Sequence, residues 1–131
     1  KRTGRHVDEI SDDEIEQHLR SGRCLSRSRY TSILDRWLAY FPREQIYVDF
    51  YDRIANEPRQ LLHNVFQHIG VSTDVDWDRF PLSERVYQGK SSGVPDRWRE
   101  FLADLLGDEI RRLHDRFGEP VTPWLKRLEN H

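Results

Sequence analysis

The residues best suited to chemistry lie between positions 87 and 95. This stretch places a lysine among glycines and serines: Gly89, Lys90, Ser91, Ser92 and Gly93. Backbone N–H groups and hydroxyls in such a loop can converge on an anion, and the lysine adds a compact positive charge. The Gly-Lys-Ser triplet is not a P-loop, because that loop needs a glycine at position 84, where this chain has Glu84. Residue chemistry alone therefore leaves two readings, an anion cradle or an ordinary flexible loop, and it favours the second.

A second basic stretch, residues 20–29, holds four arginines and three serines. Arginine forks can bind phosphate or sulfate, but a solvated charge run is the commoner use of such a segment. We expect an exposed connection here.

No metal site is expected. His63 and His68 stand five residues apart, so they do not share one helix face, and no His-Glu-x-x-His motif occurs. The alternating aspartates at 74, 76 and 78 resemble the start of a calcium loop. Arginines occupy the positions at which that loop needs a glycine and a late glutamate, Arg79 and Arg85.

The composition restricts the class of protein. The chain has 131 residues, which suits one domain or part of one, and its net charge of −2 argues against nucleic acid as a partner. Its single cysteine, Cys24, excludes an internal disulfide framework and a thiolate-rich zinc site. No apolar run is long enough to cross a bilayer and no apolar signal region follows the basic start. We therefore expect a soluble, cytoplasmic protein without a membrane partner.

Helical periodicity predicts the first elements. Ser11 and Glu14 form a capping box for a helix that reaches about Leu19 and ends at residues 21–22. A second helix over residues 30–41 is predicted from one apolar face and the stop at Pro42: the face holds Tyr30, Leu34, Trp37 and Phe41.

Residues 45–51 predict a β-strand, because β-branched and aromatic residues alternate there. A single strand cannot form a sheet. Apolar residues on one face and tyrosines on the other suit a sheet that helices cover on both sides. We therefore expect the partner strands to lie in a missing N-terminal segment or in another chain.

Further helices are predicted after this strand. Asn56 is expected to cap a helix with Pro58 in its first turn and Gly70 at its end. Residues 71–95 form a long irregular stretch, which in a compact domain is usually functional or disordered. Two helices then follow Pro95, the second ending at Gly118, and we expect the tail to dock through its tryptophan.

Together these features resemble the sulfotransferase family, the enzymes that move a sulfuryl group from 3′-phosphoadenosine 5′-phosphosulfate (PAPS). The family pattern is a Gly-x-Tyr-(x)3-Leu-x-x-Trp helix running into Phe-Pro, a strand ending near Tyr-Glu-Asp-Leu, and an Asp-Pro helix closing on Phe-Leu-Gly. Glycosaminoglycan-type members add a lysine five residues before a proline and an ending Leu-Gly-x-Pro-Val-x-x-Trp-Leu. The corresponding residues here are Ser28-Arg29-Tyr30, Leu34, Trp37, Phe41-Pro42, Tyr51-Asp52-Arg53-Ile54, Asn56-Glu57-Pro58, Phe66 to Gly70, Lys90 with Pro95, and Phe117 to Leu125. Two departures are the serine at position 28 and the aspartate at position 52.

The resemblance implies an α/β fold, the P-loop-like three-layer sulfotransferase fold, of which this mostly helical chain with one or two strands is an incomplete C-terminal part. It implies a division into residues 1–24, an N-terminal helix and basic connection, and 25–131, the sulfotransferase portion. It also implies PAPS as the donor, with Lys90 contacting it and Gly89, Ser91, Ser92 and Gly93 shaping the cradle. The family's main donor loop, Pro-x-Ser-Gly-Thr-Thr, and a catalytic base do not occur here. The catalytic residues are therefore unknown, and the chain alone is not expected to catalyse.

The alternative is a non-catalytic helical module for protein interaction on a related scaffold. The sequence does not determine the acceptor, which is a hydroxyl or an amine on a small molecule or a carbohydrate. The C-terminal pattern slightly favours a carbohydrate.

Overall fold

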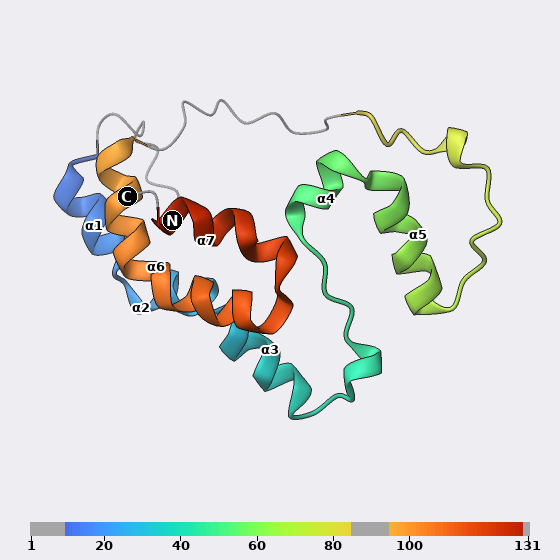
Figure 1. Cartoon of the computed structure of the whole chain (residues 1–131), viewed down its shortest axis with the longest axis horizontal. Coiled ribbons are helices and arrows are strands. Elements are labelled where there is room, and N and C mark those ends of the chain that lie inside the picture. Colours follow the sequence, from blue (N-terminus) through green and yellow to red (C-terminus); the bar gives the residue numbers. More distant parts are fainter. Residues whose placement is uncertain (1–9, 85–94, 130–131) are drawn as a thin grey trace. The chain divides into compact units, whose positions relative to one another are not determined.

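The computed structural model describes residues 10–84 and 95–129. The chain divides into two compact units, one made of residues 1–36 and 94–131 and the other of residues 37–93, which we describe separately (Figure 1). The described residues contain helices and irregular segments. None of the described helices is long and apolar enough to span a bilayer. The cytoplasmic location stays a prediction.

The first unit begins with α1, Asp12–Leu19. The predicted capping box is confirmed: the Glu14 N–H donates to Ser11 Oγ at 3.3 Å, and the Ser11 N–H donates to Glu14 Oε2 at 3.2 Å. Helix α2, Gly22–Ser28, follows at once, because Ser21 accepts a hydrogen bond from the Cys24 N–H and so caps a new helix. The expectation of a plain connection over residues 20–29 was therefore wrong.

Helix α6, Asp96–Phe117, is one continuous helix of 22 residues where the sequence predicted two. The apparent break at Gly107 is tolerated, since a helical glycine costs only about 1 kcal/mol relative to alanine. The helix ends at Gly118, whose φ of 68° belongs to the left-handed region that favours glycine. A short 3-10 turn, Glu119–Val121, then leads into α7, Thr122–Glu129.

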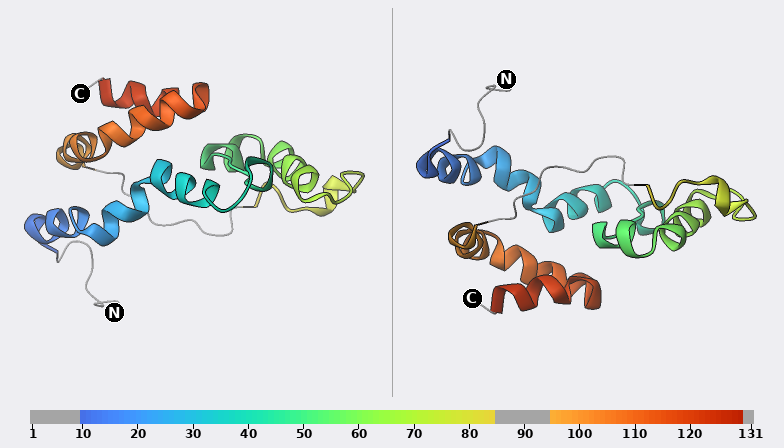
Figure 2. Two further views of the ribbon diagram at one scale, coloured as in Figure 1. Left: turned by 90° about the horizontal axis from the view of Figure 1, so that it is seen from below. Right: turned by 90° about the horizontal axis from the view of Figure 1, so that it is seen from above.

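Helix α7 returns against α6, and both views of Figure 2 show the two helices side by side. The buried apolar side chains of the described residues are Leu113 on α6 and Val121 at the turn. Trp124 on α7 is partly buried, so the C-terminal part of the chain docks back as expected.

Helix α3, Tyr30–Leu38, contributes to both units, since the division falls after Arg36. It corresponds to the predicted helix over residues 30–41. Beyond it, the second unit holds a 3-10 turn, Arg43–Gln45, the helices α4, Tyr51–Asn56, and α5, Pro58–Ile69, and a second 3-10 turn, Trp77–Arg79.

The boundaries of α5 confirm two of three predictions. Pro58 occupies its first turn, and Gly70 ends it with φ of 73°. Asn56 is not the cap: it is the last residue of α4, and Glu57 precedes α5 without a side-chain cap.

The predicted strand is an extended segment without a ladder in the described part of the chain. Ile46 and Phe50 both have β-region dihedrals, but the segment forms no strand there. Residues 51–56 are helical, although the strand was expected to end at residue 51. A strand is defined by hydrogen bonds to a neighbouring strand, so the α/β fold stays a prediction.

Apolar side chains in the second unit are poorly covered. Within residues 37–84, the described part of this unit, seven large hydrophobic residues are exposed: Trp37, Tyr40, Phe41, Tyr51, Ile54, Ile69 and Val71. Among the described residues, the fully buried side chains all belong to the first unit. The main cluster of the second unit packs Trp77 and Phe80 against Phe66 of α5, at ring-centroid distances of 5.7 and 6.2 Å from Phe66.

Candidate functional site

The predicted donor loop lies outside the described residues. Gly89, Lys90, Ser91, Ser92 and Gly93 all fall in the stretch 85–94, so their role stays a prediction. What the structure does describe is the helix into which this stretch leads. Pro95 is the residue before α6, and Asp96 and Trp98 lie in its first turn.

Helix α6 is fixed to α3 by a buried carboxylate. Glu109 is 7% exposed and Thr31 is 8% exposed. The Thr31 N–H donates to Glu109 Oε1 at 2.7 Å, and the Thr31 hydroxyl lies 2.9 Å from each carboxylate oxygen. Thr31 is in the first turn of α3, where a negative charge is stabilised by the helix dipole. We call this arrangement the Glu109–Thr31 clasp.

Two ion pairs add to this attachment. Arg116 near the end of α6 pairs with Asp35 of α3, and Arg97 near its start pairs with Asp12 of α1 at 2.7 Å. These pairs are exposed and each contributes little. With the clasp, however, they hold α6 at its start, middle and end against the N-terminal helices. The C-terminal side of the stretch 85–94 therefore joins a helix that is held in place.

The sequence did not indicate the clasp. Its two residues are 78 positions apart, and Glu109 looks like any charged residue of a surface helix. The available signal was weak: residue 109 lies between two apolar positions of the helical face, 106 and 113.

The extended segment carries a polar network at its end. Asp49 accepts hydrogen bonds from the Tyr47 hydroxyl, the Phe50 N–H at 2.8 Å and the Arg53 guanidinium at 2.8 Å. The Asp49 side chain is 12% exposed. Burial raises the pKa of Asp49, but the hydrogen bonds from Tyr47 and Phe50, together with the Arg53 charge, outweigh it, so the pKa lies below its ordinary value. Burial, and then the bond to the carboxylate, raises the pKa of Tyr47.

This network fixes the direction in which the segment enters α4. Arg53 also contacts Glu57 at 3.3 Å, so the chain from Tyr47 to the start of α5 is linked by side chains. All of its groups have partners within the network. Its arrangement suits positioning and does not resemble an acid–base pair left open for a substrate.

In the second basic stretch, Arg20 is engaged within the protein. Arg20 pairs with Glu16 at 2.8 Å, and its guanidinium lies 4.7 Å from the centre of the Phe101 ring. Among the described residues, no group of three or more histidine, cysteine or acidic side chains could hold a metal ion.

Comparison with known proteins gives a distant relationship. No family model matches the chain, and no solved structure matches it. Similar curated proteins are bifunctional heparan sulfate N-deacetylase/N-sulfotransferases. The human N-deacetylase/N-sulfotransferase 2 is 25% identical to this chain over 83% of the chain. The N-deacetylase/N-sulfotransferase 1 of Caenorhabditis briggsae is 27% identical over 76% of the chain, and that of Xenopus laevis is 28% identical over 89%.

The chain spans only a small part of these relatives, between 11% and 16% of their length. At this identity the similarity supports a general relationship and not a particular activity. The chain is therefore related, distantly, to proteins that carry a sulfotransferase.

Proposed function

We propose that this chain supplies the C-terminal part of a PAPS-dependent sulfotransferase that transfers a sulfuryl group to a hydroxyl or amine. The observation that carries the proposal is the similarity to N-sulfotransferases over three quarters or more of the chain. The order of elements is compatible with it. Helix α3, the extended segment and α5 with its Pro58 start and Gly70 end follow one another as the family resemblance implies.

Sulfuryl transfer places demands on the protein that this chain meets in part. As the acceptor oxygen or nitrogen bonds to sulfur, the bond from sulfur to the nucleotide phosphate breaks, and the acceptor proton passes to a base. Negative charge grows on the departing phosphate and must be offset by fixed donors. In the proposed enzyme, Lys90 and the N–H groups of residues 89–93 would contact the nucleotide. The base and the main donor loop lie elsewhere, so their residues are not assigned.

The attachment of α6 gives this loop a fixed end. Catalysis by positioning requires donors held within about an ångström of their target. A donor contact by Lys90 would then be made close in sequence to a helix that the Glu109–Thr31 clasp holds in place.

The test measures, by calorimetry, binding of adenosine 3′,5′-bisphosphate, the desulfo nucleotide, to the complete enzyme, in which this chain is joined to the main donor loop. Lys90→Ala is expected to weaken binding about tenfold or more, because a charge-assisted contact to phosphate contributes about 1.5–3 kcal/mol. Lys126→Ala is the matched control, since Lys126 is exposed on α7. Equal affinity of the two variants would remove Lys90 from the donor site.

The alternative, a helical interaction module, would use the exposed hydrophobic residues of the second unit as its contact surface. Such a module would not need the nucleotide. Absence of nucleotide binding and of sulfuryl transfer from labelled PAPS, in a cooperatively folding protein that carries this chain together with the main donor loop, would favour this alternative over an enzyme.

A further inference from the structure

A cavity of about 360 Å³ lies between α6 and the helices α2 and α3, within the first unit. Its volume is near the lower end of the range for small-molecule sites, roughly 300–1,000 Å³. It corresponds to about twelve water molecules in the liquid, at roughly 30 Å³ each, so it is much larger than a single inorganic anion needs.

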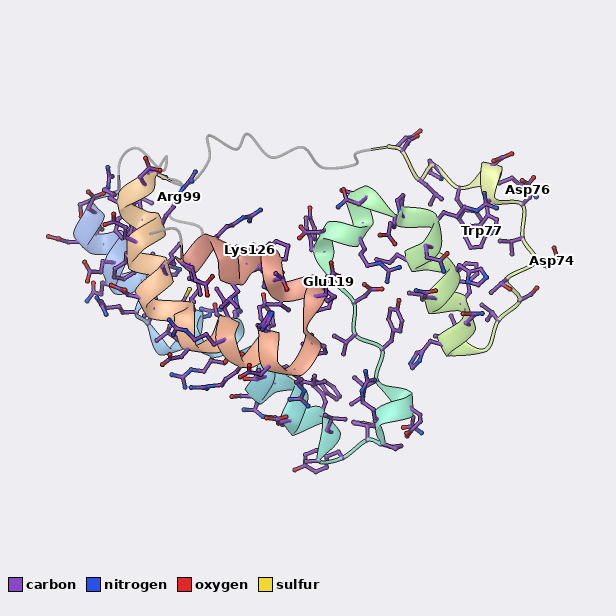
Figure 3. All side chains as sticks on the ribbon, in the orientation of Figure 1. Asp74, Asp76, Trp77, Arg99, Glu119 and Lys126 are labelled. Carbon is purple, nitrogen blue, oxygen red and sulfur yellow. The ribbon has the colours of Figure 1, made fainter. Side chains whose placement is uncertain are left out.

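One face of α6 forms a wall of this cavity. Leu105, Glu109 and Arg112 follow one another at intervals of four and three residues, which places them on the same side of the helix. Figure 3 labels Arg99 near the start of α6, and the wall begins about two turns further along the helix. From there toward the C-terminal end of α6, the wall changes from leucines to charged side chains.

Three leucines form the apolar part of the walls: Leu25 of α2 with Leu105 and Leu106 of α6. All three are half-buried, so part of the surface of each side chain is still open to solvent. Covering apolar surface of this kind with a ligand is favourable through the hydrophobic effect. These leucines therefore suit the hydrocarbon part of a ligand.

Two arginines also line the cavity, Arg29 and Arg112. Arg29 is the one residue between α2 and α3, and its carbonyl accepts the Ile33 N–H at 3.0 Å, so the first turn of α3 fixes its backbone. Within residues 10–84 and 95–129, the Arg29 guanidinium forms no ion pair. Arg112 lies 3.8 Å from Glu109 Oε2 and its side chain is 63% exposed, so this contact is long and weak. Both guanidiniums can therefore donate to an added anion.

The two carboxylates of the walls are already engaged. Glu109 accepts the Thr31 N–H and hydroxyl in the clasp, and Asp108 pairs with Arg111 at 2.9 Å. If Arg111 is counted with the two wall arginines, three guanidiniums are balanced by two carboxylates, which leaves an excess of one positive charge. A ligand with one negative charge neutralises this excess, whereas further negative charges on the ligand would have no partner.

We propose that this cavity binds a small organic monoanion, a carboxylate with a hydrocarbon body. Arg29 and Arg112 contact the carboxylate, Ser32 of α3 adds a hydroxyl donor, and the three leucines surround the hydrocarbon. The inference gives the second basic stretch a ligand through its last residue. It uses no residue of the predicted donor loop, so it goes beyond the proposed function and can hold or fail without it.

The experiment titrates octanoate, by calorimetry, into the complete protein, in which this chain is joined to the main donor loop. Octanol and inorganic sulfate are titrated in parallel. Octanoate is expected to bind at least about tenfold more tightly than either, because octanol lacks the charge and sulfate lacks the hydrocarbon body. Hexanoate should bind more weakly than octanoate, by up to about fifteenfold, since it is two methylenes shorter.

Variants locate the ligand. Arg29→Gln is expected to weaken octanoate binding about tenfold, because it removes a charge-assisted contact. Arg27→Gln is the matched control: Arg27 is exposed, belongs to the same basic stretch and does not line the cavity. We expect this control to change the affinity less than twofold. Arg29→Gln combined with Arg112→Gln should bind octanoate no more tightly than octanol.

Thermal unfolding of each variant is recorded first, and the ligand series on the unmodified protein tests the proposal even where a variant does not fold. Four results would overturn the inference: no binding of octanoate, equally tight binding of octanol or sulfate, equal losses in Arg29→Gln and Arg27→Gln, or displacement of octanoate by adenosine 3′,5′-bisphosphate. The last result would assign the anion to the donor site.

Discussion

The Glu109–Thr31 clasp makes a strong prediction for stability. In Glu109→Ala the Thr31 N–H and hydroxyl lose their acceptor, although Thr31 is 92% buried. Hydrogen bonds to a charged group contribute about 1.5–3 kcal/mol each, and a buried donor left without a partner adds its desolvation cost. Part of this is offset, because the carboxylate itself no longer has to be buried. We therefore expect the free energy of unfolding to fall by about 3–4 kcal/mol.

The assay is equilibrium unfolding in urea of the purified protein, followed by circular dichroism. Asp108→Ala is the matched control: Asp108 is the preceding residue of α6, its side chain is 83% exposed, and it pairs with Arg111 across the helix surface. An exposed pair of this kind contributes at most about 1 kcal/mol. The unfolding slope should stay the same in both variants, so that the midpoint reports stability.

A double-mutant cycle separates the hydroxyl from the rest of the clasp. Thr31→Val removes the hydroxyl and keeps the backbone N–H, and Glu109→Ala removes the acceptor of both donors. If the hydroxyl contact at 2.9 Å is real, the two changes should couple by about 1 kcal/mol. Additive effects, or a loss in Glu109→Ala no larger than in Asp108→Ala, would show that α3 and α6 are not joined in this way.

Three further predictions follow from single residues. Val121→Ala should destabilise the protein by about 2 kcal/mol in urea unfolding, because Val121 is 0% exposed and the change leaves a cavity. Gly70→Ala should lower the free energy of unfolding by about 1–2 kcal/mol, since φ at Gly70 is 73°. Gly22→Ala in α2 should be neutral or stabilising. Because neither added Cβ would meet another atom within 4 Å, comparing the thermal unfolding of the two variants isolates the effect of backbone conformation. The pKa of Asp49 is lowered in the folded state, so the contribution of Asp49 to stability is present above about pH 4 and is lost as the pH falls through the folded pKa. Asp49→Asn should therefore reduce the dependence of the free energy of unfolding on pH below about pH 4. An unchanged pH dependence would contradict the network around Asp49.

The sequence predicts an element correctly where the interacting residues lie close together in the chain. The Ser11–Glu14 capping box and the Gly70 stop involve residues within one turn of each other, so a short stretch of sequence determines them. The single helix α6 was missed for the opposite reason. Gly107 looks like a stop in a short stretch, but contacts spread over the whole helix decide whether one glycine interrupts it.

Contacts between distant residues were not predictable in this way. Nothing in the pattern around Glu109 distinguishes it from an exposed glutamate, and only the approach of α3 shows that it is buried. The surroundings of Trp77 are similar. Trp77 is an aromatic residue in a long irregular stretch, and no local pattern indicates that Arg59 lies beside its ring.

The extended segment 46–50, where a strand was predicted, adjoins the exposed side chains of the second unit. A strand needs neighbours for its backbone hydrogen bonds, and a helix with an apolar face needs a surface to cover it. Here the segment between Ile46 and Phe50 has strand-like dihedrals without a ladder in the described residues, while Trp37, Tyr51 and Ile54 on the adjoining helices are exposed. Both deficits would be met by the same addition, a sheet that pairs with the segment and lies under the helices. That is the arrangement the α/β proposal requires. In the first unit, by contrast, the helices bury Leu113 and Val121 among themselves.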